Sequence, residues 1–186
     1  NKGRSYQKEA YRKLAWFSLI NGNTEAYKSN IKTILTIKDA PTDEDKSSQK
    51  EAQQNYLPNK ELLKARILFD GAYFDKALLV MNAINQNKLT DTRSQIEYFY
   101  RKARIYDELK NTNEAVKNYL LTIQKGENSK YYFAANACIK LANIFEFQKK
   151  KNNAITYYQK ATDLDKDEYT NSINAEAKAG LNRLGK

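Results

Sequence analysis

Four carboxylates lie close together near the C-terminus, at Asp163, Asp165, Asp167 and Glu168. Alternating aspartates are typical of calcium-binding loops, but such a loop needs a glycine where Glu168 stands and a bidentate glutamate where Asn174 stands. We therefore interpret the cluster as an acidic, solvated connection between helices. The chain contains no histidine. This removes the usual serine–histidine and cysteine–histidine nucleophile pairs and the usual zinc sites.

Nothing else in the sequence indicates catalysis. No glycine-rich loop of either standard phosphate-binding spacing occurs. Carboxylate-only catalysis, as in glycosidases, stays open from residue types alone, but no pattern places two carboxylates in a shared pocket. The single cysteine, Cys138, falls on the expected inner face of a helix and is predicted to be a small core residue rather than a reactive thiol. We predict a protein that is not an enzyme and that uses neither metal nor cofactor.

Positive charge is the main compositional signal. The chain has 32 basic and 22 acidic residues, a formal net charge of +10, and fourteen tyrosines. Basic and aromatic residues together can bind single-stranded nucleic acid. An acidic protein partner or simple solubility explains the charge as well. Many of the tyrosines recur at helix-packing positions, so they are expected in the core and not on a base-stacking surface. No run of about eighteen apolar residues is present, and the start at Asn1 suggests a piece of a larger protein.

The strongest pattern is a repeated spacing. A small residue is followed by a bulky apolar residue three positions later, an alanine twelve later and a larger side chain sixteen later. The three copies are Ala65, Leu68, Ala77, Met81; Ala103, Tyr106, Ala115, Tyr119; and Ala142, Phe145, Ala154, Tyr158. Two antiparallel helices approach closely only where both carry small side chains, so the alanines mark contacts within helical hairpins. Such repetition predicts a stack of hairpins, an architecture that usually binds other proteins.

The repeated segments resemble the tetratricopeptide repeat (TPR), a helix–turn–helix motif with a small/aromatic/alanine signature. The matching segments are YRKARIYDELKNTNEAVKNYLLTI at 100–123, IKLANIFEFQKKKNNAITYYQKAT at 139–162 and LKARILFDGAYFDKALLVMNAI at 63–84. The family's early tryptophan is replaced by Phe99 and Cys138, and its turn glycine by Lys110 and Lys149. The resemblance implies an all-α, TPR-like α-solenoid of helix–turn–helix hairpins with a C-terminal capping helix.

We predict a single TPR-like domain over residues 1–186. Its parts are a degenerate hairpin at 1–38, an irregular insertion at 39–58, repeats at 59–95, 96–130 and 131–168, and a capping helix at 169–186. Within the insertion, residues 42–55 are expected to form an exposed helix or a mobile segment. The predicted N-caps of helices are Thr42 or Asp43, Asn59, Asn113 and Asn153. Ile173, Ala177 and Leu181 form one stripe on the last helix, which would seal the final apolar face.

In proteins of this family the first helix of each hairpin lines the concave face. The resemblance therefore implies a partner-binding stripe on three helices, comprising Leu62, Arg66, Phe69; Glu97, Tyr100, Arg104, Asp107; and Asn136, Ile139, Asn143, Glu146. Arg66 and Arg104 suit carboxylates, Tyr100 suits stacking, and Asn136 and Asn143 suit a peptide backbone. Chaperone binding is not predicted, because Tyr100 stands where a lysine is expected.

These residues predict a protein–protein interaction module, or scaffold, that binds a segment of a partner protein in the groove. The alternatives are a structural spacer or self-association module, and a basic binder of single-stranded nucleic acid. Two other interpretations of the stripe remain open at this stage. Its polar residues could simply solvate the groove, or the chain's own residues 42–55 could fill it.

Overall fold

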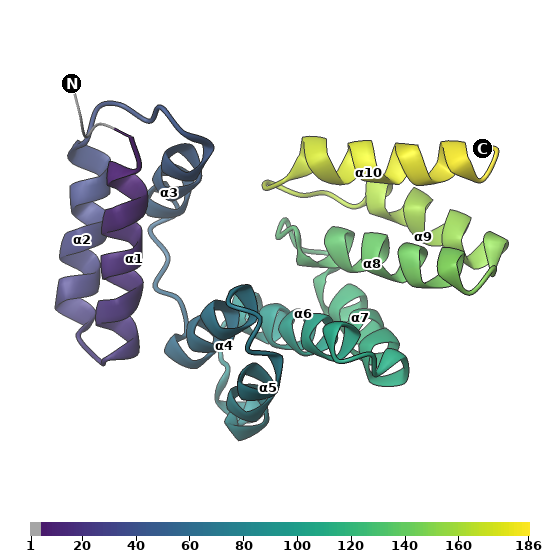
Figure 1. Ribbon diagram of the computed structural model, residues 1–186, viewed down its shortest axis with the longest axis horizontal. Coiled ribbons are helices and arrows are strands. Elements are labelled where there is room, and N and C mark those ends of the chain that lie inside the picture. The colour runs from purple at the N-terminus through teal and green to yellow at the C-terminus, as the bar shows by residue number, and fades with distance from the viewer. Residues whose placement is uncertain (1–4) are drawn as a thin grey trace. The chain divides into compact units, whose positions relative to one another are not determined.

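The computed structural model describes residues 5–186, and within them the protein is all-α, as the sequence predicts (Figure 1). The α-helices are α1 (Gln7–Ile20), α2 (Thr24–Thr36), α3 (Asp43–Gln53), α4 (Lys60–Asp70), α5 (Phe74–Ala83), α6 (Thr92–Glu108), α7 (Thr112–Gly126), α8 (Phe133–Phe147), α9 (Lys151–Asp163) and α10 (Thr170–Arg183). A short 3-10 helix, η1 (Gln86–Lys88), precedes α6. The chain forms two compact units, one ending at Lys64 and the other spanning Ala65–Lys186.

Four helix–helix turns share one backbone conformation. The turn residue with positive φ is Gly22 after α1 (82°), Ala72 after α4 (60°), Lys110 after α6 (60°) and Lys149 after α8 (60°). In each turn this residue donates its N–H to the carbonyl three residues back, and the next residue donates to the carbonyl five back, at 2.8–3.0 Å. This pair of bonds is the Schellman motif, which satisfies the last carbonyls of a helix. Two lysines and an alanine therefore occupy positions with a positive φ, where glycine is favoured. The neighbouring Gly71 does not occupy the positive-φ position of its turn.

The common turn also decides where the following helices begin. Asn111 is the N-cap of α7 and accepts the Glu114 N–H at 3.3 Å, and α9 begins directly after Lys150. The predicted caps Asn113 and Asn153 are therefore wrong, because both lie within the first turn of their helices. The predicted caps Thr42 and Asn59 are confirmed. Thr42 Oγ1 accepts the Asp45 N–H at 3.1 Å, and Asn59 Oδ1 accepts the Glu61 and Leu62 N–H groups at 3.0 and 3.1 Å.

In the N-terminal unit, α1, α2 and α3 pack against one another. Its apolar core contains Ala15, Trp16, Leu19, Tyr27 and Leu63. The helix expected at 42–55 is present as α3, but it is not simply exposed, because one face is buried at Asp45, Ser48 and Ala52. Polar bonds hold this face to α1. They join Lys8 Nζ to Gln49 Oε1 at 2.9 Å, Arg12 to Ser47 Oγ at 3.1 Å and Trp16 Nε1 to Glu51 Oε1 at 2.7 Å.

Asp45 caps α1 from another helix. The N-cap residue of α1, Tyr6, makes no side-chain capping bond of its own. Instead, the carboxylate of Asp45 accepts the Tyr6 N–H at 2.8 Å and the Glu9 N–H at 3.2 Å. Burial alone would raise the pKa of Asp45, but these bonds and one from Thr42 outweigh it and hold the pKa below 3.8. The negative charge also complements the positive end of the α1 dipole.

We expect Asp45→Ala to lower the free energy of unfolding of the N-terminal unit by about 1 to 2 kcal/mol, the cost typical of losing an N-cap. Because the folded-state pKa lies below the unfolded value, the stabilisation by Asp45 is present above pH 4 or so and is lost as the pH falls further. Urea denaturation of wild type and variant at pH 7 and pH 3 measures both effects. A difference that grows towards pH 3 would contradict this account.

In the C-terminal unit the repeated alanines lie at the helix contacts. Ala65, Ala77, Ala103, Ala115, Ala142 and Ala154 are all 0% exposed. The tyrosines at the last position of the second and third copies, Tyr119 and Tyr158, are buried in the same core. Cys138 is also buried, and burial raises the pKa of its thiol to about 12, so it is a neutral core residue as predicted. Packing runs between successive helices from α5 to α10.

The last helix, α10, packs against α9 and α8. Ile173 and Ala177 of the predicted stripe are buried there, and Leu181 is partly buried. Gly180 faces the ring of Tyr158 so closely that a Cβ at this position would lie 2.3–2.6 Å from three ring atoms. The Tyr158 hydroxyl donates to Glu146 Oε2 at 2.6 Å, and Arg183 of α10 binds the same carboxylate at 2.9–3.0 Å. A polar network therefore fixes α10 to the hairpin before it.

Candidate functional site

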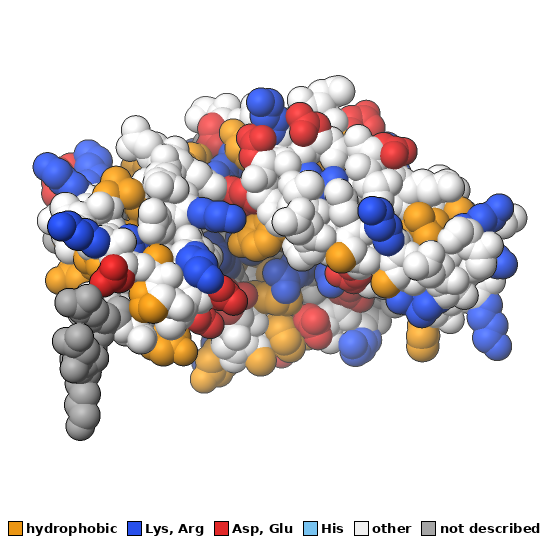
Figure 2. All heavy atoms as spheres, turned by 90° about the horizontal axis from the view of Figure 1, so that it is seen from above, with side chains coloured by type: hydrophobic (Ala, Val, Ile, Leu, Met, Phe, Trp, Pro, Cys, Tyr) orange, Lys and Arg blue, Asp and Glu red, His pale blue; other side chains and the backbone are white. Residues whose placement is uncertain are grey.

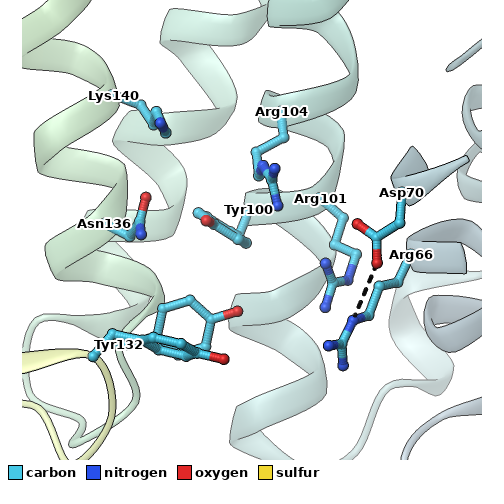
Figure 3. Close-up of a pocket in the computed structure, with 9 residues that line it drawn as sticks. Arg66, Asp70, Tyr100, Arg101, Arg104, Tyr132, Asn136 and Lys140 are labelled. Atoms are coloured by element: carbon cyan, nitrogen blue, oxygen red, sulfur yellow. Dashed lines mark ion pairs between the residues drawn. The ribbon is translucent and has the colours of Figure 1, made fainter. Parts of the chain in front are cut away.

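Residues from three successive hairpins of the C-terminal unit meet around one pocket of about 250 Å³ (Figure 3). The pocket is lined by Arg66, Asp70, Tyr100, Arg101, Arg104, Tyr132, Asn136, Lys140 and Tyr169. These residues come from α4, α6 and α8 and from the residues immediately before α8 and α10. Figure 3 shows the α8 side chains on one side of Tyr100 and the arginines of α6 and α4 on the other. We call this site the basic pocket.

Tyrosine rings form much of the wall of the basic pocket. The ring centroids of Tyr100 and Tyr132 are 5.9 Å apart, and those of Tyr132 and Tyr169 are 4.7 Å apart, both edge-to-face. Tyr100 is 2% exposed and also packs against Phe133, so it is part of the core and not an open groove wall. Burial raises the pKa of Tyr100 and of Tyr132 above the usual value of 10. Both hydroxyls are therefore neutral hydrogen-bonding groups at physiological pH.

Two of the four cations in the basic pocket have carboxylate partners. Arg101 Nε lies 2.8 Å from Glu97 Oε1, and both side chains are buried. Burial lowers the pKa of Arg101, but the charge of Glu97 outweighs burial and the net shift is upward. Arg66 Nε lies 3.7 Å from Asp70 Oδ2 (Figure 3). These two ion pairs therefore add little net charge to the pocket.

The other two cations, Arg104 and Lys140, form no ion pair with any residue among 5–186. The guanidinium of Arg104 instead lies over the ring of Phe69, 4.2 Å from its centroid. Asp107 of α6 does not line the pocket; it accepts the Tyr119 hydroxyl at 3.2 Å and interacts electrostatically with Lys140. The lining therefore carries an excess of two positive charges over Asp70 and the adjacent Glu97.

One acceptor in the basic pocket has no donor. Asn136 Oδ1 is buried and makes no hydrogen bond within the described residues. An unsatisfied buried acceptor costs free energy, commonly 1–3 kcal/mol, unless a ligand or water supplies a donor. The pocket thus offers cationic and hydroxyl donors, and a ligand N–H or O–H group would reach the buried Asn136 Oδ1 only if the amide side chain turned towards it.

The structure brings together four of the eleven residues of the predicted stripe. Arg66, Tyr100, Arg104 and Asn136 line the basic pocket. Phe69 lies beneath Arg104 and packs against Phe74. Glu97 and Asp107 are held by the contacts described above.

The remaining four residues of the stripe lie elsewhere. Leu62 and Ile139 are each 1% exposed and buried, so neither offers a surface to a partner. Asn143 and Glu146 belong to the network with Tyr158, in which the two oxygens Asn143 Oδ1 and Glu146 Oε2 lie 2.5 and 2.6 Å from the hydroxyl. Glu146 also binds Arg183, and these bonds lower its pKa, that from Arg183 most. These contacts attach α10 to the helices that precede it.

Sequence reasoning missed five residues of the basic pocket, namely Asp70, Arg101, Tyr132, Lys140 and Tyr169. Lys140 follows Asn136 by four residues, so helical spacing alone could have placed it on the stripe. Arg101 is adjacent to Tyr100 and points to the edge of the same face. Tyr132 and Tyr169 precede α8 and α10 and carry no periodic signal, because they lie outside the helices.

Residues 5–186 contain neither a cluster of metal ligands nor a helix able to span a membrane. No three His, Cys, Asp or Glu side chains come close enough together to hold a metal ion. In the acidic connection before α10, Asp165 accepts the Lys166 N–H at 2.9 Å, and Lys166 Nζ donates to the carbonyls of Ala161 and Leu164 at the end of α9. None of the described helices has both the length and the apolar character needed to span a membrane.

Comparison with known proteins gives one match. Residues 72–182 match the model of a family described as "Uncharacterized protein conserved in bacteria (DUF2225)". The matched region contains the whole lining of the basic pocket except Arg66 and Asp70. No curated protein and no solved structure matches the chain.

Proposed function

This protein belongs to that family, since the match covers more than half of the chain, and we propose that it is a protein–protein interaction module of TPR-like architecture. Three features support the architecture: the alanine spacing, the packing between successive helices, and the four turns of identical backbone conformation. An α-solenoid presents the first helices of its hairpins along one surface, where repeat proteins bind their partners. The basic pocket lies between three such helices.

The observation that carries the proposal is the unsatisfied bonding capacity of the basic pocket. Arg104 and Lys140 form no ion pair with a described carboxylate, although Asp107 interacts electrostatically with Lys140, and Asn136 Oδ1 has no donor. An extended peptide supplies both missing elements, because acidic side chains pair with cations and main-chain N–H groups donate to amide oxygens. We infer that a segment of a partner protein enters the pocket with an anionic group towards Arg104 and Lys140 and its backbone towards Asn136.

The alternative of nucleic-acid binding has less support. Five of the tyrosines that suggested base stacking, Tyr27, Tyr98, Tyr100, Tyr119 and Tyr158, are buried in helix packing. On the face shown in Figure 2, basic side chains are interspersed with acidic and uncharged ones. Single-stranded nucleic acid usually needs a continuous basic groove with exposed aromatic rings.

A peptide array tests the proposed function. We expect one class of peptide, from a set that includes unmodified, acidic and phosphorylated sequences, to bind the wild-type chain. The double variant Arg104→Gln with Lys140→Gln should bind that class at least about tenfold more weakly, since each lost charge pair is commonly worth 1 kcal/mol or more. Fluorescence polarisation with peptides taken from the array measures the change.

The matched control is the double variant Lys102→Gln with Lys117→Gln, which loses the same charge outside the basic pocket. Lys102 lies over the rings of Tyr98 and Tyr106, and Lys117 is exposed on α7. The control should bind as the wild type does. If no peptide class binds, or if the pocket variant and the control bind equally, the pocket is not a peptide site.

A further inference from the structure

The basic pocket has features that select the chemical class of the anionic group. We propose that it binds a dianionic phosphate monoester, carried as a phosphorylated side chain by the partner segment. This inference rests on the proposed function and names the group that the segment presents to Arg104 and Lys140.

The charge balance favours a dianion over a carboxylate. Four cations line the pocket, and Asp70 and Glu97 offset two of them. A single carboxylate would neutralise one of the two remaining charges, whereas a phosphate monoester carries about −1.5 to −2 at pH 7. Of the two unpaired cations, Arg104 presents a planar fork of donors and Lys140 a point charge, and clusters containing arginine recognise phosphorylated segments in other proteins.

The donors are also distributed as three phosphate oxygens require. Arg104 lies on α6, Lys140 lies on α8, and the hydroxyls of Tyr100, Tyr132 and Tyr169 belong to the same lining. In Figure 3 the labelled cations approach from opposite sides of Tyr100. A carboxylate has two oxygens in one plane, while a phosphate group accepts hydrogen bonds in three directions. Donors on opposing walls therefore match the phosphate better.

Two observations indicate that the phosphate is attached to a peptide. The volume of about 250 Å³ lies below the 300–1,000 Å³ typical of pockets that enclose a whole small molecule, so a side-chain group fits better than a nucleotide. The buried acceptor Asn136 Oδ1 would remain unsatisfied by phosphate alone. A main-chain N–H beside the phosphorylated residue would satisfy it.

The test uses calorimetry with matched synthetic peptide pools. Each pool has randomised flanks around a fixed central residue, which is serine, glutamate, phosphoserine, phosphothreonine or phosphotyrosine. Inorganic phosphate and O-phosphoserine are titrated alongside. We expect at least one phosphorylated pool to bind about tenfold or more tightly than the serine and glutamate pools and than inorganic phosphate. Lys140→Gln should weaken that binding by about tenfold, and Lys102→Gln should leave it unchanged.

The outcomes separate this inference from the proposed function. Equal binding of the glutamate and phosphorylated pools, lost in Lys140→Gln, would overturn the phosphate inference and leave the peptide site standing. If inorganic phosphate binds as tightly as any pool, the pocket is a site for free phosphate, and the inference that a peptide carries the phosphate is wrong. Binding by no pool and no phosphate would overturn both. Asn136→Ala gives a further check, because it should weaken the phosphorylated pool but not inorganic phosphate.

Discussion

Arg101→Met is expected to lower the free energy of unfolding of the C-terminal unit by about 3 to 5 kcal/mol. The Arg101 and Glu97 side chains are 6% and 10% exposed, and their closest contact is 2.5 Å. Removing one partner of a buried ion pair leaves the other charge without compensation in a medium of low dielectric, which is the costly case. Methionine fills a similar volume, so the loss reflects charge more than packing. Chemical denaturation followed by circular dichroism measures it.

The double variant Glu97→Met with Arg101→Met is the control for this interpretation. Replacing both members of a buried pair by apolar residues of similar size is often nearly neutral. We therefore expect the double variant to recover most of the stability that Arg101→Met loses. If the double variant is less stable than the single one, packing and not an unpaired charge is responsible. Should Arg101→Met itself cost less than about 1 kcal/mol, the pair is solvated in solution.

Gly180→Leu is expected to destabilise the same unit by about 3 kcal/mol, the upper part of the range for overpacking. Even a Cβ at Gly180 would lie 2.3 Å from Tyr158 Cζ. The ring cannot turn away freely, because its hydroxyl is bound to Glu146 and lies 3.2 Å from its donor Arg183. The larger side chain must therefore displace α10 and break this network.

Ala179→Leu provides the comparison, since Ala179 is the exposed neighbour of Gly180 on α10. It should change the denaturation midpoint little. Gly180→Ala should fall between the two, because alanine gains about 1 kcal/mol of helix propensity over glycine while its methyl group still meets the ring. A Gly180→Leu protein with a wild-type midpoint would show that α10 does not pack on Tyr158 in solution.

The all-α fold and the buried alanines were predictable because both follow from local periodicity. An alanine at a fixed offset from another alanine reports a helix contact whatever the rest of the chain does. The first residues of the helices that follow the turns could not be predicted in the same way. Lysine at positions 110 and 149 adopts the positive φ expected of glycine, so the turns end earlier than Asn113 and Asn153 suggest, with the N-caps at Asn111 and Lys150. Residue type alone did not reveal this conformation.

The helix α3 was misjudged for a different reason. Its sequence is strongly polar, and polar composition normally indicates exposure. Here, Asp45 and Ser48 are buried because their hydrogen bonds are satisfied. Asp45 accepts from the start of α1, which lies 36–39 residues away in sequence. Bonds at that separation leave no periodic signal.

The candidate site was predictable only where its residues lie on helices. The stripe identified Arg66, Tyr100, Arg104 and Asn136, because three- and four-residue steps place side chains on one face. Spacing does not reveal which residues of the stripe are already hydrogen-bonded to other side chains of the same protein. Asn143 bonds to Tyr158 of α9, 15 residues further along the chain, and to Glu176 of α10, 33 residues further along.

The basic pocket has no wall that belongs to a single hairpin. Its lining is drawn from α4, α6 and α8 and from Tyr169 before α10, and the helices from α5 to α10 are joined by packing between successive helices. The width of its mouth therefore depends on how these helices pack against one another. A change in the packing of α6 against α8 would alter the distance between Arg104 on α6 and Lys140 on α8 without any contact to either side chain.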